Sequence, residues 1–434
     1  MPLFHRLATA CAAMLSGLLL LAAASPTLAQ SGYVRAGKLV DVERGRVLSD
    51  QLIRYVDGRI VSVAPYTSAP ADGPVTDWSR YTVLPGLIDL HTHLVGADQG
   101  ASPADPLTHS AGDDVLTGVR NARQTLRAGF TTVRDVGVWR GLLDTDLRDA
   151  INDGRVEGPR MKVAGAYITI PGGGGEVTGL APDVSPPDEM RRGVVYSDED
   201  VRLRARWLFQ HHVDFLKLIV TGAVLTVGTE PGQMELSEAQ VRIAVAVANE
   251  YRSFVAAHAH GAEGIKAAIR AGARTIEHAS LIDDEGIALA RTRPVWLVMD
   301  IYNGDFIDEV GRRDGWPAET LRKNLETTEE QRVGFRKAVA AGVKIAFGTD
   351  AGVYPNGLNA RQFPYMVRYG MTPMQAIQSA TSVAAEAMMW SNDVGAVSPG
   401  RYADMIAVEG DPLQDISILS HVKAVMKGGV VVSQ

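Results

Sequence analysis

The strongest constraint on the fold is an alternation of short apolar segments with longer amphipathic segments through the middle of the chain. This pattern is typical of parallel strands joined by crossover helices, in the α/β class. We expect eight strands, at 84–91, 131–136, 161–167, 215–220, 254–258, 275–278, 295–300 and 344–350. Eight such units predict a (β/α)8 TIM barrel. An open doubly wound sheet is the alternative, but it would need a glycine-rich turn after the first strand, where His-Thr-His stands instead.

Helix start signals support two of the crossover helices. Ser197 is followed three residues later by Asp200, and Ser237 is followed at the same spacing by Gln240. A serine whose hydroxyl accepts the backbone N–H three residues on is a common first residue of a helix. The sequence therefore predicts helices at 197–211 and 237–252.

Both ends of the chain contain short β-type segments separated by Gly and Asp. They lie at 37–42, 51–56 and 59–63, and again at 404–408 and 424–432. We expect the two ends to pair into one small β-sandwich domain, made of 30–83 and 391–434. The metal-dependent barrel would then occupy 84–390.

The first 29 residues are predicted to be a secretory signal peptide. Arg6 precedes an apolar run at 8–24, and small residues follow up to Ala29, the expected cleavage point. A membrane anchor is the alternative, but the run is shorter than the roughly 20 residues that span a bilayer. We therefore expect a secreted protein, periplasmic or extracellular, without stable membrane insertion after cleavage. Cys11, the single cysteine, lies in this segment, so the mature chain would have neither disulfides nor thiolate ligands.

Charge gives no sign of a nucleic-acid partner. The formal net charge is −7, and acidic and basic residues are mixed along the chain without a Lys/Arg run. A small-molecule substrate is the expected partner. Because 46% of the residues are hydrophobic, the chain can bury a sizeable core, and intrinsic disorder is not expected.

Polar residues interrupt the predicted strands mainly at their C-terminal ends, where a barrel gathers its active site. These residues are His91, His93, Lys217, His258, His260, His278 and Asp350. Side chains alternate along a strand, so His91 and His93 should point to the same side, as a chelating pair must. Five of the ten histidines therefore belong to three strand ends, and together they predict a metal site.

Lys217 lies among large apolar residues, where an unpaired ammonium group would be costly to bury. One interpretation is an ion pair with a buried carboxylate. The other is a reaction with carbon dioxide, which turns the cationic lysine into an anionic carbamate with two oxygens able to bridge metal ions.

In order and spacing, these motifs resemble the amidohydrolase superfamily members that hold a carboxylated-lysine binuclear centre. The resemblance rests on VLPGLIDLHTH at 83–93, Lys217, His258, His278 and GTDAG at 348–352, and it covers essentially the whole mature chain. AHAHG at 257–261 and TIEHA at 275–279 are most similar to the imidazolonepropionase-like and Xaa-Pro dipeptidase-like branch, which includes ochratoxin-degrading amidohydrolases.

The resemblance implies two divalent ions, for which zinc suits the imidazole-rich donor set. His91, His93 and Asp350 would hold the first ion, and His258 and His278 the second. Lys217, as N6-carboxylysine, would bridge both. Asp350 would also be the catalytic base. His260 is interpreted as a substrate contact, although an exchange of roles with His258 stays open. Tyr167 and Tyr302 are expected to contact the substrate. Glu277 or Asp89 is expected to support the metal ligands without binding the ions.

The implied activity is hydrolysis of the amide bond of dipeptides or N-acyl amino acids, with ochratoxin A as a further candidate. Cyclic imides, lactams and lactones are the alternative substrates, and a binding protein without activity is the alternative class. The resemblance also implies a homo-oligomer. One departure affects the substrate: relatives in this branch carry Gly-Gly-His after the third strand, whereas this chain has PGGGG at 171–175.

Overall fold

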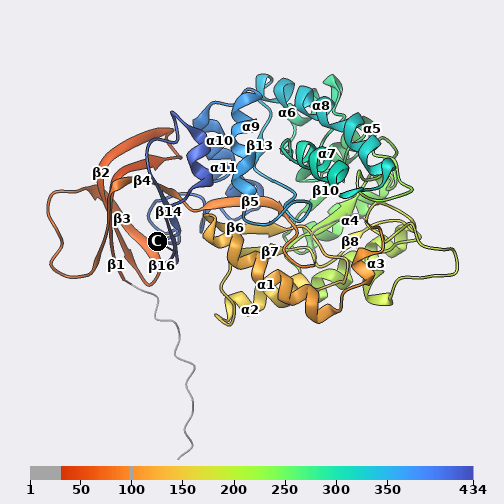
Figure 1. Cartoon of the computed structure of the whole chain (residues 1–434), viewed down its shortest axis with the longest axis horizontal. Coiled ribbons are helices and arrows are strands. Elements are labelled where there is room, and N and C mark those ends of the chain that lie inside the picture. The colour runs from red at the N-terminus through yellow and green to blue at the C-terminus, as the bar shows by residue number, and fades with distance from the viewer. Residues whose placement is uncertain (1–30, 97–101, 434) are drawn as a thin grey trace, which may run out of the picture.

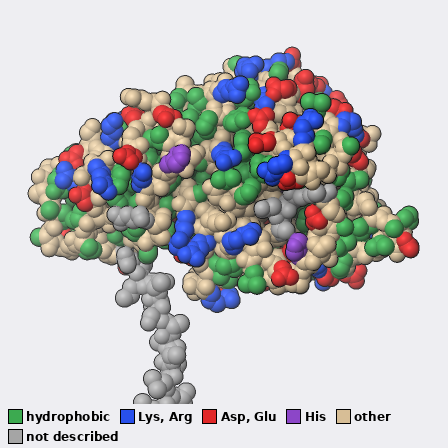
Figure 2. Space-filling view, viewed as in Figure 1, with side chains coloured by type: hydrophobic (Ala, Val, Ile, Leu, Met, Phe, Trp, Pro, Cys, Tyr) green, Lys and Arg blue, Asp and Glu red, His purple; other side chains and the backbone are tan. Residues whose placement is uncertain are grey.

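The computed structural model describes residues 31–96 and 102–433, and its elements form a β-rich domain beside a larger α/β body (Figure 1). The predicted signal peptide lies outside the described residues. Within the described ranges, no helix is both long and apolar enough to cross a bilayer. On the face drawn in Figure 2, acidic and basic side chains are interspersed over the surface.

The β-rich domain joins the two ends of the chain in one seven-stranded sheet, ordered β16-β15-β14-β4-β1-β2-β3. Its strands are β1 (Gly32–Asp41), β2 (Arg46–Val56), β3 (Arg59–Pro65), β4 (Val75–Pro85), β14 (Met405–Val408), β15 (Ala424–Lys427) and β16 (Val430–Ser433). The antiparallel pairing of β14 with β4 connects the C-terminal strands to the N-terminal ones. Pairing of the two ends thus agrees with expectation, whereas a two-layered sandwich and the boundaries at 84 and 391 stay predictions.

The α/β body contains two parallel sheets, one ordered β5-β6-β7 and the other β13-β12-β11-β10-β9-β8. Their strands are β5 (Leu87–Thr92), β6 (Phe130–Asp135), β7 (Arg160–Val163), β8 (Tyr167–Ile168), β9 (Leu216–Ile219), β10 (Val255–Ala259), β11 (Thr275–His278), β12 (Trp296–Val298) and β13 (Ile345–Ala346). The outer strands meet, because Leu90 N–H donates to Phe347 O (3.0 Å) and Asp350 N–H donates to His91 O (2.8 Å). This arrangement is consistent with the predicted barrel.

The third predicted strand, 161–167, is two strands rather than one. β7 pairs with β6, and β8 pairs with β9, so the chain changes sheets between them. Gly165 makes this step possible with φ +75°, and a Cβ there would lie 2.6 Å from Val213 Cγ1. The conformation and the close packing both favour glycine. The last predicted strand, 344–350, also shortens to β13 because its end turns toward the site.

Eleven α-helices occur in the described ranges, most of them around the barrel. They are α1 (Ala111–Arg127), α2 (Leu143–Asn152), α3 (Asp198–Gln210), α4 (Glu238–Glu250), α5 (Ala262–Ala271), α6 (Asp284–Thr292), α7 (Asn303–Asp314), α8 (Ala318–Ala340), α9 (Gln362–Arg368), α10 (Pro373–Ser379) and α11 (Ser382–Ala387). Both predicted helix starts are confirmed: the Ser197 hydroxyl accepts Asp200 N–H, and Ser237 forms a reciprocal capping box with Gln240.

Candidate metal centre

The predicted ligands meet in a cavity of about 750 Å³ at the C-terminal ends of the barrel strands. The cavity is lined by His91, His93, Tyr167, Lys217, His258, His260, His278 and Asp350, among others. Of the predicted site residues, Tyr302 is not among those that line it. Six strands or their following loops thus deliver these side chains to one place.

The first group of possible ligands is His91, His93 and Asp350, whose ligand atoms lie within 4.8 Å of one another. Asp350 Oδ1 lies 3.4 Å from His91 Nε2 and 3.2 Å from His93 Nε2. Lys217 Nζ lies 3.5 Å from the same His91 Nε2. These atoms converge on one point, as the ligands of an ion must.

The second group is His258, His260 and His278, with the same mutual spacing. His258 Nε2 lies 3.2 Å from Gly222 O. Because a carbonyl only accepts, Nε2 carries the proton and Nδ1 keeps its lone pair. His260 Nδ1 lies 2.8 Å from Ser280 Oγ. Both histidines belong to the group, so the choice between them as ligand stays a prediction.

Three other histidines are oriented by acceptors at Nδ1. His91 Nδ1 lies 2.9 Å from Glu277 Oε2, His93 Nδ1 lies 3.0 Å from Gly137 O, and His278 Nδ1 lies 3.0 Å from Asp300 Oδ1. Each Nδ1 therefore donates, and each Nε2 keeps the lone pair that a metal needs. Proteins commonly orient metal-binding imidazoles in this way. The donor set fits divalent metal ions by its chemistry.

A buried arginine forms an ion pair with Glu277. Arg134 and Glu277 have fully buried side chains, and their ion pair is 2.7 Å long. Arg134 also donates to Leu90 O (2.6 Å) and Thr275 Oγ1 (2.8 Å). Since one carboxylate oxygen pairs with Arg134 and the other accepts from His91, Glu277 links the barrel interior to the first group.

Asp89 supports the turn before Asp350 rather than a ligand side chain. It accepts hydrogen bonds from Thr349 Oγ1 (2.6 Å) and Asn359 Nδ2 (2.7 Å). Burial raises the pKa of Asp89 to about 7, against the lowering effect of these bonds. Of the two carboxylates expected behind the ligands, only Glu277 contacts a predicted ligand's side chain.

Asp350 is held by an amide that the sequence did not point to. Asn303 Nδ2 lies 3.1 Å from Asp350 Oδ2 and also 3.1 Å from Asp300 Oδ2. Gln331 Nε2 in turn lies 2.9 Å from Asp300 Oδ1. Asp350 and His278 both have positive φ, 59° and 66°. Such conformations are unfavourable for these residues, and they cluster where function requires a side chain to be aimed.

Burial and neighbouring charges tune the protonation of the site. Burial lowers the pKa of His91, His258 and His260 well below the usual value, which favours the neutral imidazole that binds metal. Burial also opposes the charged form of His278, but Asp300 outweighs it and raises the pKa of His278. Burial lowers the pKa of Lys217 to about 8.

The two predicted tyrosine contacts lie in different surroundings. Tyr167 lines the cavity, and its hydroxyl donates to Gly137 O (3.0 Å) and lies 3.2 Å from His93 Nδ1. Tyr302 packs its ring against Tyr354 and Tyr365, and its hydroxyl accepts from Arg361 (3.0 Å). A substrate contact at Tyr302 stays a prediction that the lining of the cavity does not support.

The glycine loop at 171–175 forms part of the cavity wall. Gly174 N–H donates to both oxygens of Glu235, at 3.0 and 2.9 Å. A Cβ at Gly175 would lie 2.8 Å from Ile219 Cγ1 and from Tyr167 Cβ. The loop therefore packs too closely on β8 and β9 to carry a side chain at Gly175 without moving the wall.

The sequence model of the amidohydrolase family matches residues 82–432. This chain belongs to the amidohydrolase family. The expected branch is confirmed as well, because the relatives of this amidohydrolase include ochratoxinase, imidazolonepropionase and a Xaa-Pro dipeptidase.

Three relatives illustrate the likeness. Ochratoxinase of Aspergillus niger is 30% identical over 418 residues, which cover 88% of this chain and 81% of the relative. Imidazolonepropionase of Nocardia farcinica is 26% identical, with 83% and 85% covered. The crystal structure of a Xaa-Pro dipeptidase with bound methionine has 36% identity and a TM-score of 0.88, with 93% of this chain and 100% of that chain covered. This amidohydrolase is therefore a hydrolase acting on C–N bonds.

Proposed function

We propose that this amidohydrolase holds two divalent metal ions, zinc by preference, and cleaves the amide bond of dipeptides or N-acyl amino acids. The observation that carries the proposal is the convergence of two ligand groups on one cavity, each histidine having its other nitrogen engaged. His91, His93 and Asp350 would bind the first ion. His258 and His278 would bind the second, with His260 lining the substrate site.

Lys217 is proposed as the bridging ligand in its carbamate form. The neutral amine attacks the carbon of carbon dioxide, a C–N bond forms, and one amine proton leaves to solvent. In the described part of the chain, the one side-chain hydrogen-bond partner of Lys217 is His91 Nε2. Glu277 and Asp350 raise the pKa of Lys217 from a distance without forming an ion pair with it. These surroundings favour the carbamate over the alternative of a lysine paired with a carboxylate.

The reaction uses the residues as follows. When bound, two divalent ions would lower the pKa of a water molecule and polarise the scissile carbonyl. Asp350 accepts the proton of the attacking water and delivers it to the leaving nitrogen. The Asn303 amide keeps Asp350 Oδ2 in place during this transfer. One O–H bond of water and the C–N bond of the amide break, and a C–O bond and an N–H bond form, so the step balances.

Dipeptides and N-acyl amino acids are the proposed substrates because the relatives include a Xaa-Pro dipeptidase and ochratoxinase. Ochratoxin A is a further candidate for the same reason. Cyclic imides, lactams and lactones are the second class, since the same centre could polarise their carbonyls. A secreted location, from the predicted signal peptide at 1–29, and a homo-oligomeric state belong to the same proposal.

Metal analysis and a substrate screen test the proposal. We expect close to two equivalents of zinc in the purified protein, loss of activity on chelation, and its return with added zinc. Metal-loaded protein should hydrolyse dipeptides or N-acyl amino acids faster than lactams. If the analysis finds a single equivalent of zinc, the centre is mononuclear rather than binuclear. Full activity in metal-free protein, or no turnover of any amide, would refute the proposal.

A further inference from the structure

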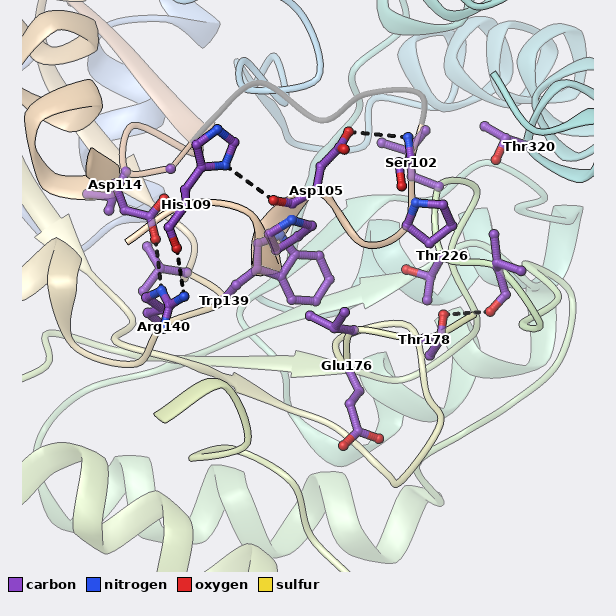
Figure 3. Close-up of a pocket in the computed structure, with 18 of the residues that line it drawn as sticks. Ser102, Asp105, His109, Asp114, Trp139, Arg140, Glu176, Thr178, Thr226 and Thr320 are labelled. Atoms are coloured by element: carbon purple, nitrogen blue, oxygen red, sulfur yellow. Dashed lines mark hydrogen bonds and ion pairs between the residues drawn. The ribbon is translucent and has the colours of Figure 1, made fainter. Parts of the chain in front are cut away.

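A second cavity of about 870 Å³ lies beside the metal cavity, and Figure 3 shows residues that line it. We call it the annex. The two cavities share Trp139, Leu225 and Thr226 as lining residues, so they lie next to each other. Its walls come mostly from loops that follow the barrel strands, the end of the barrel at which substrates bind.

Apolar side chains dominate the wall of the annex. They are Val95, Pro103, Pro106, Val138, Trp139, Leu143, Val177, Leu225, Val227 and Pro317. A concave, mostly apolar cavity next to a few polar groups is the usual form of a small-molecule site. The annex therefore suits an apolar group that extends from the reaction centre.

Most charged groups of the annex are paired, whereas the Asp105 carboxylate accepts a hydrogen bond from Ser102 N–H. Arg140 lies 3.2 Å from Asp114 and 2.9 Å from Glu189. Glu176 pairs with Arg191 at 2.6 Å. Figure 3 shows the Arg140 and Asp114 pair at one side of the annex and the Glu176 carboxylate directed away from Trp139. Two arginines face three carboxylates here, and Asp105 adds a fourth carboxylate, so the annex disfavours an anionic group.

Trp139 connects the annex to the proposed centre. Its ring meets the Tyr167 ring edge to face, with centroids 5.4 Å apart. The Tyr167 ring meets the imidazole of His93 in the same way, at 6.0 Å. An aromatic surface thus runs from a predicted metal ligand to the annex, and flat aromatic groups pack well on such edges and faces.

We propose that the annex is a specificity subsite for a large aromatic side group of the amide substrate. The proposal rests on the proposed function and adds the substrate class: amides with a bulky aromatic group on one side of the scissile bond. Small side chains would leave the apolar wall unfilled, so they should react with lower kcat/KM.

Filling the annex tests this inference. Val177→Phe and Leu143→Trp each place an aromatic ring where the substrate group would lie. The substrates are 2-naphthylalanyl-glycine, glycyl-2-naphthylalanine and glycyl-alanine, so the two naphthyl dipeptides show which side of the bond the annex serves. For the favoured naphthyl dipeptide we expect kcat/KM to fall at least about tenfold in both variants, and less than about threefold for glycyl-alanine.

Matched control variants carry the same changes on the surface. Val184→Phe and Leu203→Trp alter exposed side chains that line neither cavity. These two variants should have the same kcat/KM as the parent protein for all three substrates. An equal loss for the naphthyl and alanyl substrates, or no loss with folded, metal-loaded variants, would overturn the subsite. If the parent protein cleaves no dipeptide, the proposed function fails first; if it cleaves all three equally well, the subsite alone fails.

Discussion

Asp350 has two proposed roles, because it would bind a metal ion and also transfer the proton. Its Oδ1 faces His91 and His93, whereas its Oδ2 accepts a hydrogen bond from Asn303. The two oxygens are therefore held in different surroundings. Such a division lets one carboxylate bind an ion through one oxygen and keep the other in a fixed position for the proton.

Asp350→Asn should leave a folded protein with activity lower by about 10²–10⁴-fold, the loss typical of a missing general base. The amide has nearly the same shape but cannot accept the proton. Because Asp350 is also a proposed ligand, kcat and metal content should be measured on the same sample. Asp308→Asn, an exposed change on α7, is the control and should keep both values. Full activity in Asp350→Asn would assign the base elsewhere.

Lys217→Ala should weaken binding of at least one ion and abolish activity, because the carbamate is needed as an anion rather than as a lysine. The change also leaves space in the cavity, which a small carboxylate could enter. Formate or acetate should then restore part of the activity, since each presents two oxygens. Lys344→Ala, at an exposed lysine, should show neither the loss nor the rescue.

The carbamate would be ruled out by a different pattern. If Lys217 serves in a buried ion pair, Lys217→Ala should destabilise the fold by roughly 3–5 kcal/mol without rescue by carboxylates. The parent protein would then also show no density for bound carbon dioxide at Lys217 in a crystal structure. Thermal unfolding and that crystal structure measure these two outcomes.

Strand ends were predictable from the sequence because burial and periodicity are local signals. His91, His258 and His278 all end or nearly end observed strands, as expected. Asp300 was missed, although the same rule applies to it: it is the polar end of the predicted strand 295–300. The break at Gly165 was missed because its cause, contact with Val213, lies far along the chain.

Other parts of the site depend on contacts between residues that are far apart in the sequence. Asn303 begins α7 and bonds to Asp350, 47 residues along the chain, and Gln331 of α8 bonds to Asp300 across the end of the barrel. Arg134 is a polar residue inside an apolar strand, which is a usable signal, but its partner Glu277 is on another strand. Contacts between elements depend on packing, and spacing in the sequence does not encode that packing.

Helix α8 holds the loop after β9 through one buried lysine. Lys323 is completely buried and donates to Thr226 O (2.7 Å) and Thr229 O (3.0 Å), and it pairs with Glu319 at 2.9 Å. Leu225 and Thr226 of this loop line both cavities. An element outside the barrel thus positions a wall of the substrate site.

Lys323→Met should release this loop while keeping most of the apolar volume of the side chain. We expect KM to rise and kcat/KM to fall roughly tenfold or more, because small displacements of positioning groups are costly. Zinc content should stay the same, since no predicted ligand is changed. Lys337→Met removes an exposed ion pair on the same helix and should leave kinetics unaltered. A fall in kcat together with metal loss would contradict the positioning role.

In the whole molecule, the terminal sheet and the barrel are joined by buried polar contacts as well as by the chain. Arg160 of β7 forms two hydrogen bonds with Asp404, at 2.7 and 3.1 Å. Asp404 also accepts Gly428 N–H at 2.6 Å, and Lys427 donates to Gly158 O at 2.6 Å. These contacts lie between the N-terminal end of the barrel and the last strands of the sheet, away from the metal centre.

Arg160→Met should therefore lower stability without impairing the chemistry. The change leaves the Asp404 carboxylate buried without its partner, which costs about 3–5 kcal/mol for a buried pair. Unfolding followed by intrinsic fluorescence should show this loss. Below the unfolding transition, kcat/KM and zinc content should match the parent, because the pair touches neither cavity. Arg155→Met is the matched control: it breaks an exposed pair with Asp153 and should scarcely change stability. Loss of zinc in folded Arg160→Met would instead mean that the terminal sheet helps to hold the strand ends in register.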